Sequence, residues 1–171
     1  MHGKPQGMTC SSPRNLRLND GSCMTGKTIR VELSQRHDYR FDIAFGGDAP
    51  VLTSDEPAPL GAGLGPSPMQ LLCAAVGNCL SDSLLFAFRK FKQVPEPMHC
   101  TVTAEVGRNA ENRLRVLHMT VQIRLGVEAS ALEQVDHVLA QFEEFCTVTQ
   151  SVRQGIPVTV EVFDGAGVQL K

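Results

Sequence analysis

Apolar and polar residues alternate with period two along several stretches of the chain, a pattern typical of half-buried β-strands. Between these stretches lie short polar or glycine- and proline-rich segments that suit turns. The alternation predicts strands at residues 29–33, 39–45, 51–53, 100–106, 117–125 and 156–162. The first two and the fourth and fifth are close enough in sequence to form β-hairpins.

One segment between the strands is apolar on nearly every side. It runs from Met69 to about Gln93, and it is apolar all round as far as Leu80. Ser67 followed by Pro68 predicts its start, because serine caps helices and proline suits the first helical position. Such a helix must be covered on all sides. The chain has only one other long helix to cover it, so we expect a homodimer.

That second helix is predicted to begin at Ser130, where Glu133 three residues later completes a capping box, and to end near Cys146. The order of strands, helix, strands, helix and strand indicates an α+β fold. We expect a single domain over residues 28–171. Residues 1–27 have the composition of a flexible N-terminal tail.

Composition and charge exclude several classes of protein. With 42% apolar and 20% charged residues the chain is globular, and a net charge of −2 argues against a nucleic-acid partner. No apolar run reaches membrane-spanning length, and the N-terminus lacks the apolar core of a secretory signal. We therefore expect a cytoplasmic protein without a membrane partner. Structural disulfides are rare in that compartment.

The six cysteines are therefore the candidates for chemistry. They contain no C-x-x-C pair, so no metal site is predicted. Cys79 lies inside the apolar helix, and Cys146 lies at the end of the second helix. A free cysteine often serves only as a small core residue. We assign that role to Cys73 and Cys100, while Cys10 and Cys23 belong to the tail.

Three stretches around these positions together resemble the OsmC/Ohr family. They are residues 65–72 (GPSPMQLL), 77–80 (GNCL) and 146–152 (CTVTQSV). The resemblance covers roughly residues 28–163. It implies an organic hydroperoxide reductase in which antiparallel sheets wrap around two central helices of an intertwined homodimer. It further implies that Cys79 attacks the peroxide and that Cys146 resolves the product. The implied reductant is an external, lipoyl-like dithiol, and no cofactor is bound.

This chemistry needs a thiolate, and burial in apolar surroundings raises the pKa of a thiol. A cation should therefore lie beside Cys79. The family supplies an arginine from the loop after its first strand. Arg36 lies in that loop here and is the first choice, and Arg40 on the second strand is the alternative.

The chain departs from the family pattern where its central helix begins. The family's peroxidases commonly carry a glutamate there, and this chain has Met69 and Gln70. Glu56 or Asp55 in the preceding loop is the available substitute. The proline that usually follows the second cysteine is replaced by Thr147. Two other functions stay open: a binding or redox-sensing module with little turnover, and a structural dimer with inert cysteines.

Overall fold

The computed structural model describes residues 26–171, so nearly all of the predicted tail, with Cys10 and Cys23, lies outside the described residues. The elements in chain order are β1 (Glu32–His37), β2 (Arg40–Ala44), β3 (Leu52–Ser54), α1 (Pro68–Lys90), β4 (His99–Arg108), β5 (Leu114–Arg124), the 3₁₀ turn η1 (Ala129–Ala131), α2 (Val135–Gln141), the 3₁₀ turn η2 (Phe142–Phe145), α3 (Thr147–Val152) and β6 (Val158–Phe163). The expected α+β class is confirmed.

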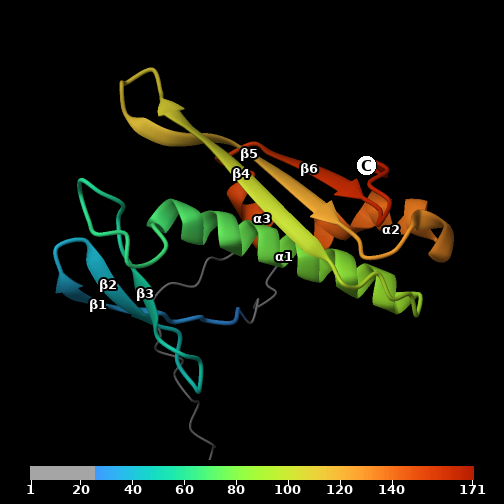
Figure 1. Ribbon diagram of the computed structural model, residues 1–171, viewed down its shortest axis with the longest axis horizontal. Coiled ribbons are helices and arrows are strands. Elements are labelled where there is room, and N and C mark those ends of the chain that lie inside the picture. The colour runs from blue at the N-terminus through green and yellow to red at the C-terminus, as the bar shows by residue number, and fades with distance from the viewer. Residues whose placement is uncertain (1–25) are drawn as a thin grey trace, which may run out of the picture.

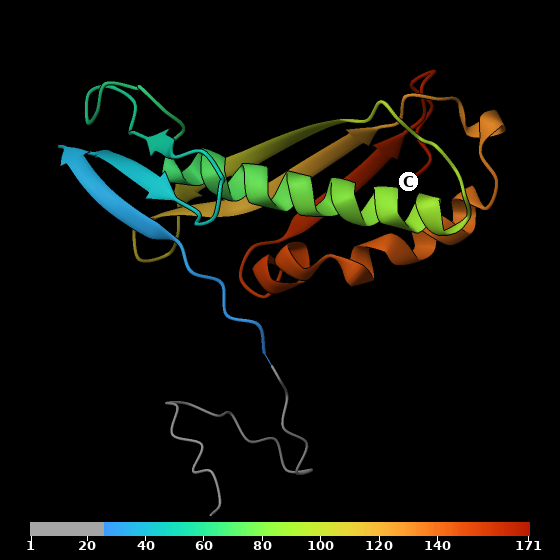
Figure 2. The same ribbon diagram turned by 90° about the horizontal axis from the view of Figure 1, so that it is seen from below.

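The strands form two separate sheets (Figure 1). The first is the antiparallel sheet β1–β2–β3, which lies beside the N-terminal end of α1. In the second, β4 and β5 pair antiparallel and β6 adds parallel to β5. The helices pack on one face of this second sheet, and the first sheet stands apart from that body (Figure 2).

The core lies between α1, the β5 strand and the chain from α2 to α3. Four α1 side chains spaced four residues apart are fully buried, namely Val76, Leu80, Leu84 and Phe88. They meet the inward face of β5, where Met119, Val121 and Ile123 are buried, and Leu125 directly after the strand continues this face. A Cβ at Gly77 would lie 2.7 Å from Cγ2 of Val102, so glycine allows α1 to approach β4 closely.

The start of α1 is as predicted. Ser67 caps the helix, and its hydroxyl accepts a hydrogen bond from the Gln70 N–H at 3.4 Å. The Gln70 side chain in turn accepts one from the Ser67 N–H at 2.8 Å, which completes a capping box. Pro68 occupies the first turn. Local sequence therefore fixes the position at which this helix begins.

By length and composition α1 is long and apolar enough to cross a membrane, so the expectation that no segment reaches that length is wrong. One such helix is weak evidence for a membrane protein, because central helices of globular proteins have the same composition. Only 28% of its most apolar stretch is buried within the chain. Much of the apolar surface of α1 therefore remains uncovered.

The predicted second helix is interrupted. Ser130 does not cap it, since its hydroxyl contacts the Glu128 carboxylate and α2 begins only after Gln134, whose φ is 58°. The N–H of Glu133 donates to the side chain of Gln93 at 3.0 Å instead of joining a capping box. A tertiary contact thus replaces the local cap, and Cys146 precedes α3 rather than ending a long helix.

The first predicted strand is displaced. Residues 29–31 lie outside β1, and all residues of β1 are exposed, Leu33 to 61%. The apolar alternation there predicts a buried face, but β1 is an edge strand that pairs only with β2. No part of the described chain covers it. Its apolar side chains therefore lack the cover that their pattern predicts.

Loss of the Phe88 side chain should destabilise the protein far more than loss of the Phe86 side chain. Phe88 has no exposed surface, whereas Phe86 on the same helix is 57% exposed. Because truncation leaves a core cavity, we expect Phe88→Ala to lower the free energy of unfolding by about 3–5 kcal/mol. For Phe86→Ala we expect a loss of less than about 1 kcal/mol. Urea denaturation measures both, and equal losses would contradict this packing.

Candidate functional site

The two cysteines singled out by sequence are brought together by the fold. Cys79 lies midway along α1 and is partly buried, while Cys146 has no exposed surface at the junction of η2 and α3. Both thiols are free, and the Cys146 thiol is close enough to shift the pKa of Cys79. The residues lie 67 positions apart (146 − 79) in the sequence, so tertiary packing alone creates this pair.

The surroundings of Cys79 act on its thiol in opposite directions. Burial, and then the interaction with the Cys146 thiol, raise the pKa of Cys79. The backbone N–H groups of Val148 and Thr149 act the other way, because they donate to the Cys79 sulfur and stabilise its thiolate. These N–H groups are free because they belong to the first turn of α3. Sequence patterns gave no signal for this contribution of α3.

Cys146 is more deeply buried than Cys79. Its thiol donates a hydrogen bond to Oγ1 of Thr149 at 3.1 Å, and Thr149 is also fully buried. Solvent and small molecules therefore reach Cys79 before Cys146. The pair has one accessible thiol and one enclosed thiol, an arrangement that suits sequential reaction of the two sulfur atoms.

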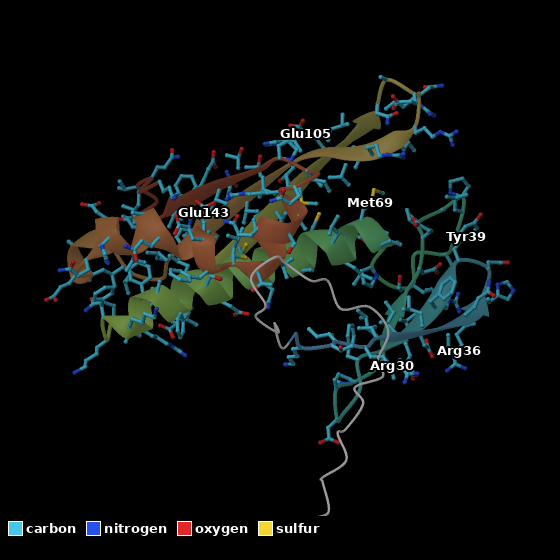
Figure 3. All side chains as sticks on the ribbon, turned by 180° about the vertical axis from the view of Figure 1, so that it is seen from behind. Arg30, Arg36, Tyr39, Met69, Glu105 and Glu143 are labelled. Carbon is cyan, nitrogen blue, oxygen red and sulfur yellow. The ribbon has the colours of Figure 1, made fainter. Side chains whose placement is uncertain are left out.

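Arg36 forms an ion pair with Asp42 on the small sheet, away from Cys79 and Cys146. Its guanidinium lies 2.6 Å from Oδ2 of Asp42, and its side chain is 64% exposed. Figure 3 shows Arg36 on the small sheet, away from the first turn of α1 that Met69 marks. Met69 is itself 43% exposed. The structure of one chain therefore leaves Arg36 at a distance from Cys79.

Arg40 is held differently. Its side chain is only 33% exposed, and its Nε lies 3.8 Å from Oδ2 of the buried Asp55. That Nε is buried and has no hydrogen-bond partner among residues 26–171. The main influences on the pKa of Cys79 come from burial, Cys146, Val148 and Thr149, and none of them is an arginine or lysine of residues 26–171. Within the described part of a single chain, the expected cation is therefore not among the groups that dominate the pKa of Cys79.

The loop after β3 is organised around Asp55 rather than Glu56. Asp55 is 2% exposed and accepts hydrogen bonds from the N–H groups of Ala62 and Leu64, each at 3.2 Å. Burial opposes ionisation of Asp55. The backbone donors and the Arg40 charge outweigh it, so the pKa of Asp55 is lowered. Glu56 is half-buried, and its backbone carbonyl accepts the N–H of Gly63 at 3.0 Å. Asp55 is therefore the acid that approaches Arg40.

Cys100 is exposed and is therefore not the core residue that was expected, whereas Cys73 is half-buried and packs against the core. Both line an open cavity of about 360 Å³ between α1 and β4, and Cys100 is exposed. Partial burial raises the pKa of Cys100, against the effect of a hydrogen bond with Ser81. Their positions on α1 and β4 separate them from the Cys79–Cys146 pair, which faces η2 and α3.

Comparison with known proteins places this geometry in a family. The model of the family described as OsmC-like protein matches residues 61–161. No curated protein matches the chain.

Solved structures show the same fold at low sequence identity. An OsmC-like protein of unknown function from Vibrio cholerae has a TM-score of 0.69 at 15% identity, covering 81% of this chain and 100% of its own. An organic hydroperoxide resistance protein from Elizabethkingia anophelis gives 0.64 at 15%, covering 81% and 97%. The organic hydroperoxide resistance protein OhrB of Bacillus subtilis gives 0.61 at 16%, covering 80% and 98%. The chain belongs to the OsmC-like protein family.

Proposed function

We propose that this protein is a thiol-dependent peroxidase that reduces organic hydroperoxides to alcohols. The observation that carries the proposal is the contact between a partly exposed thiol, Cys79, and a buried thiol, Cys146. Two of the similar structures are named organic hydroperoxide resistance proteins, which supports the same chemistry. We place the activity in the cytoplasm, where reductants keep these thiols free.

The proposed cycle begins at the accessible thiol. The Cys79 thiolate attacks one oxygen of the O–O bond, so that a sulfur–oxygen bond forms and an alkoxide leaves and takes up a proton. Cys79 is thereby oxidised to a sulfenic acid. The Cys146 sulfur then attacks the Cys79 sulfur, which forms a disulfide and releases water. An external dithiol of the lipoyl-like type reduces the disulfide by thiol exchange and leaves as its own cyclic disulfide. No bound cofactor takes part.

A second copy of the chain completes the proposed site. No cation from residues 26–171 of the same chain is among the groups that dominate the pKa of Cys79, and both α1 and β1 expose apolar side chains that a partner would cover. Arg40 is the better candidate for the partner's cation than Arg36. Arg40 is half-buried with an unpaired Nε, whereas Arg36 already donates to Asp42 at 2.7 Å.

In this arrangement Asp55 takes the place of the glutamate that the family usually carries at the start of the helix. It is buried, ionised and next to Arg40, so it can orient the guanidinium. Glu56 supports the loop through its backbone, whose N–H donates to the Asp55 carboxylate and whose carbonyl accepts from Gly63. The arginine and its acid would then both come from the small sheet and the loop that follows it.

The alternative function is a binding or redox-sensing module with little turnover. The observations that favour it are the raised pKa of Cys79 and the absence of a carboxylate at Met69. Such a module would retain an apolar ligand without consuming peroxide. Catalytic consumption of cumene hydroperoxide in the presence of a dithiol therefore separates the two functions.

The role of Cys146 is tested by Cys146→Ser. With one equivalent of cumene hydroperoxide, the wild type should form a Cys79–Cys146 disulfide because the thiols are in contact. The variant should stop at a sulfenic acid on Cys79, which a dimedone adduct reveals by mass spectrometry.

Cys73→Ser is the matched control for this experiment, because Cys73 also lies on α1 but lines the cavity between α1 and β4. It should form the same disulfide as the wild type. A disulfide that uses a different cysteine would contradict the role of Cys146. Thiols that survive peroxide in the wild type would favour the binding module.

A further inference from the structure

The face of the β4–β6 sheet that is turned away from the helices carries a polar hollow. Its volume is about 210 Å³, and it spans all three strands of the sheet seen in Figure 1. The lining residues are His99 and Thr101 from β4, Gln122 and Arg124 from β5, and Phe163 from β6. Cys79 and Cys146 lie among the helices on the opposite face. The hollow is therefore separate from the thiol site.

Two basic side chains face each other across this hollow. His99 and Arg124 are direct partners in the antiparallel pairing of β4 and β5. Like charges at directly opposed positions destabilise a sheet when the histidine is protonated. Among residues 26–171, neither side chain forms an ion pair or a side-chain hydrogen bond. The N–H donors of His99 and Arg124 therefore have no carboxylate partner among residues 26–171.

The two acidic residues near Phe163 in the sequence, Glu161 and Asp164, already accept hydrogen bonds from other groups. Glu161 accepts a hydrogen bond from Nε2 of Gln122 at 2.8 Å. Asp164 is buried and accepts the N–H groups of Ala129 and Val168, at 3.1 and 2.8 Å. Neither carboxylate neutralises Arg124, so the hollow keeps an excess of hydrogen-bond donors.

The position of Arg124 is also constrained. Its guanidinium nitrogens lie 3.8 and 3.9 Å from the point where a Cβ of Gly167 would stand, against the turn that follows β6. Gly167 has a φ of +87°, a conformation that suits glycine. The guanidinium thus rests on backbone at one edge of the hollow, with the His99 strand at the other edge.

We propose that this hollow binds the phosphate group of a small molecule. A guanidinium presents two parallel N–H donors to an oxyanion, and the imidazole and the Thr101 hydroxyl add donors from the neighbouring strand. Because His99 and Arg124 are direct cross-strand partners, one anion could accept hydrogen bonds from both strands at once. The Phe163 side chain forms an apolar wall beside this position, which suits the organic part of a phosphate ester.

Calorimetric titration of the full-length protein with inorganic phosphate and with phenyl phosphate, each to about 50 mM at constant ionic strength, tests this site. We expect saturable binding of both. Tighter binding of phenyl phosphate indicates a phosphate ester, and equal binding indicates free phosphate. The imidazole resonances of His99, assigned by comparison with His99→Gln, should shift in the same titration.

Arg124→Gln should weaken phosphate binding by about tenfold or more, because it removes the charged donor of the site. Arg115→Gln is the matched control. Arg115 is also exposed on β5, but it lies outside the hollow and should leave the affinity unchanged. Equal weakening by the two variants, or no saturable binding by the wild type, would overturn the proposal.

Discussion

Cys79→Ser should reduce the rate of peroxide consumption by at least about a thousandfold, because a serine hydroxyl at this position cannot replace the sulfur nucleophile. The measurement is loss of cumene hydroperoxide in the presence of a dithiol, together with a count of free thiols. The fold should be unaffected, since serine is similar in size and Cys79 is only partly buried. Circular dichroism and the urea midpoint check this.

Cys100→Ser provides the comparison for this result. Cys100 is more exposed than Cys79, and it lines the cavity on the other side of α1. Desolvation raises its pKa, as it does for Cys79. We expect peroxide consumption close to that of the wild type. If Cys79→Ser and Cys100→Ser consumed peroxide equally fast, the thiol pair described above would not be the reactive centre.

Arg40→Met should raise the pKa of Cys79 in the assembled protein. Burial raises the pKa of this thiol within one chain, and a nearby guanidinium would lower it by favouring the thiolate. Loss of the guanidinium should therefore slow alkylation by iodoacetamide at pH 7 by about ten- to a thousandfold. The rate should recover as the pH rises toward the new pKa, above the ordinary value of 9.0. The pH profile of alkylation measures this shift directly.

Arg36→Met is the control for this experiment, because Arg36 pairs with Asp42 on the exposed side of the small sheet. Its profile should match that of the wild type. Light scattering on each variant should give about twice the chain mass of 18.6 kDa. Identical profiles for Arg40→Met and the wild type, both as dimers, would show that Arg40 does not serve Cys79.

Local signals in the sequence were sufficient where neighbouring residues decide the structure. Ser67, Pro68 and Gln70 place the start of α1, since all the groups that cap it lie within one turn. The alternation of apolar and polar residues over 117–125 likewise predicts β5 and its buried face, because successive side chains of a strand point to opposite faces. Between Ser130 and Cys146 the spacing of apolar residues predicted one continuous helix, and this prediction was wrong. There the side chain of Gln93 binds the N–H of Glu133 and the chain bends at Gln134.

The sequence by itself therefore determined the α+β order of elements, the central apolar helix and the identity of the two candidate thiols. Only the tertiary structure decided that Cys79 and Cys146 meet, that the first turn of α3 donates to the Cys79 sulfur, and that Asp55 rather than Glu56 approaches Arg40. The physical reason is range. Helix caps and strand alternation depend on residues a few positions apart, whereas these contacts join residues that are distant in the sequence.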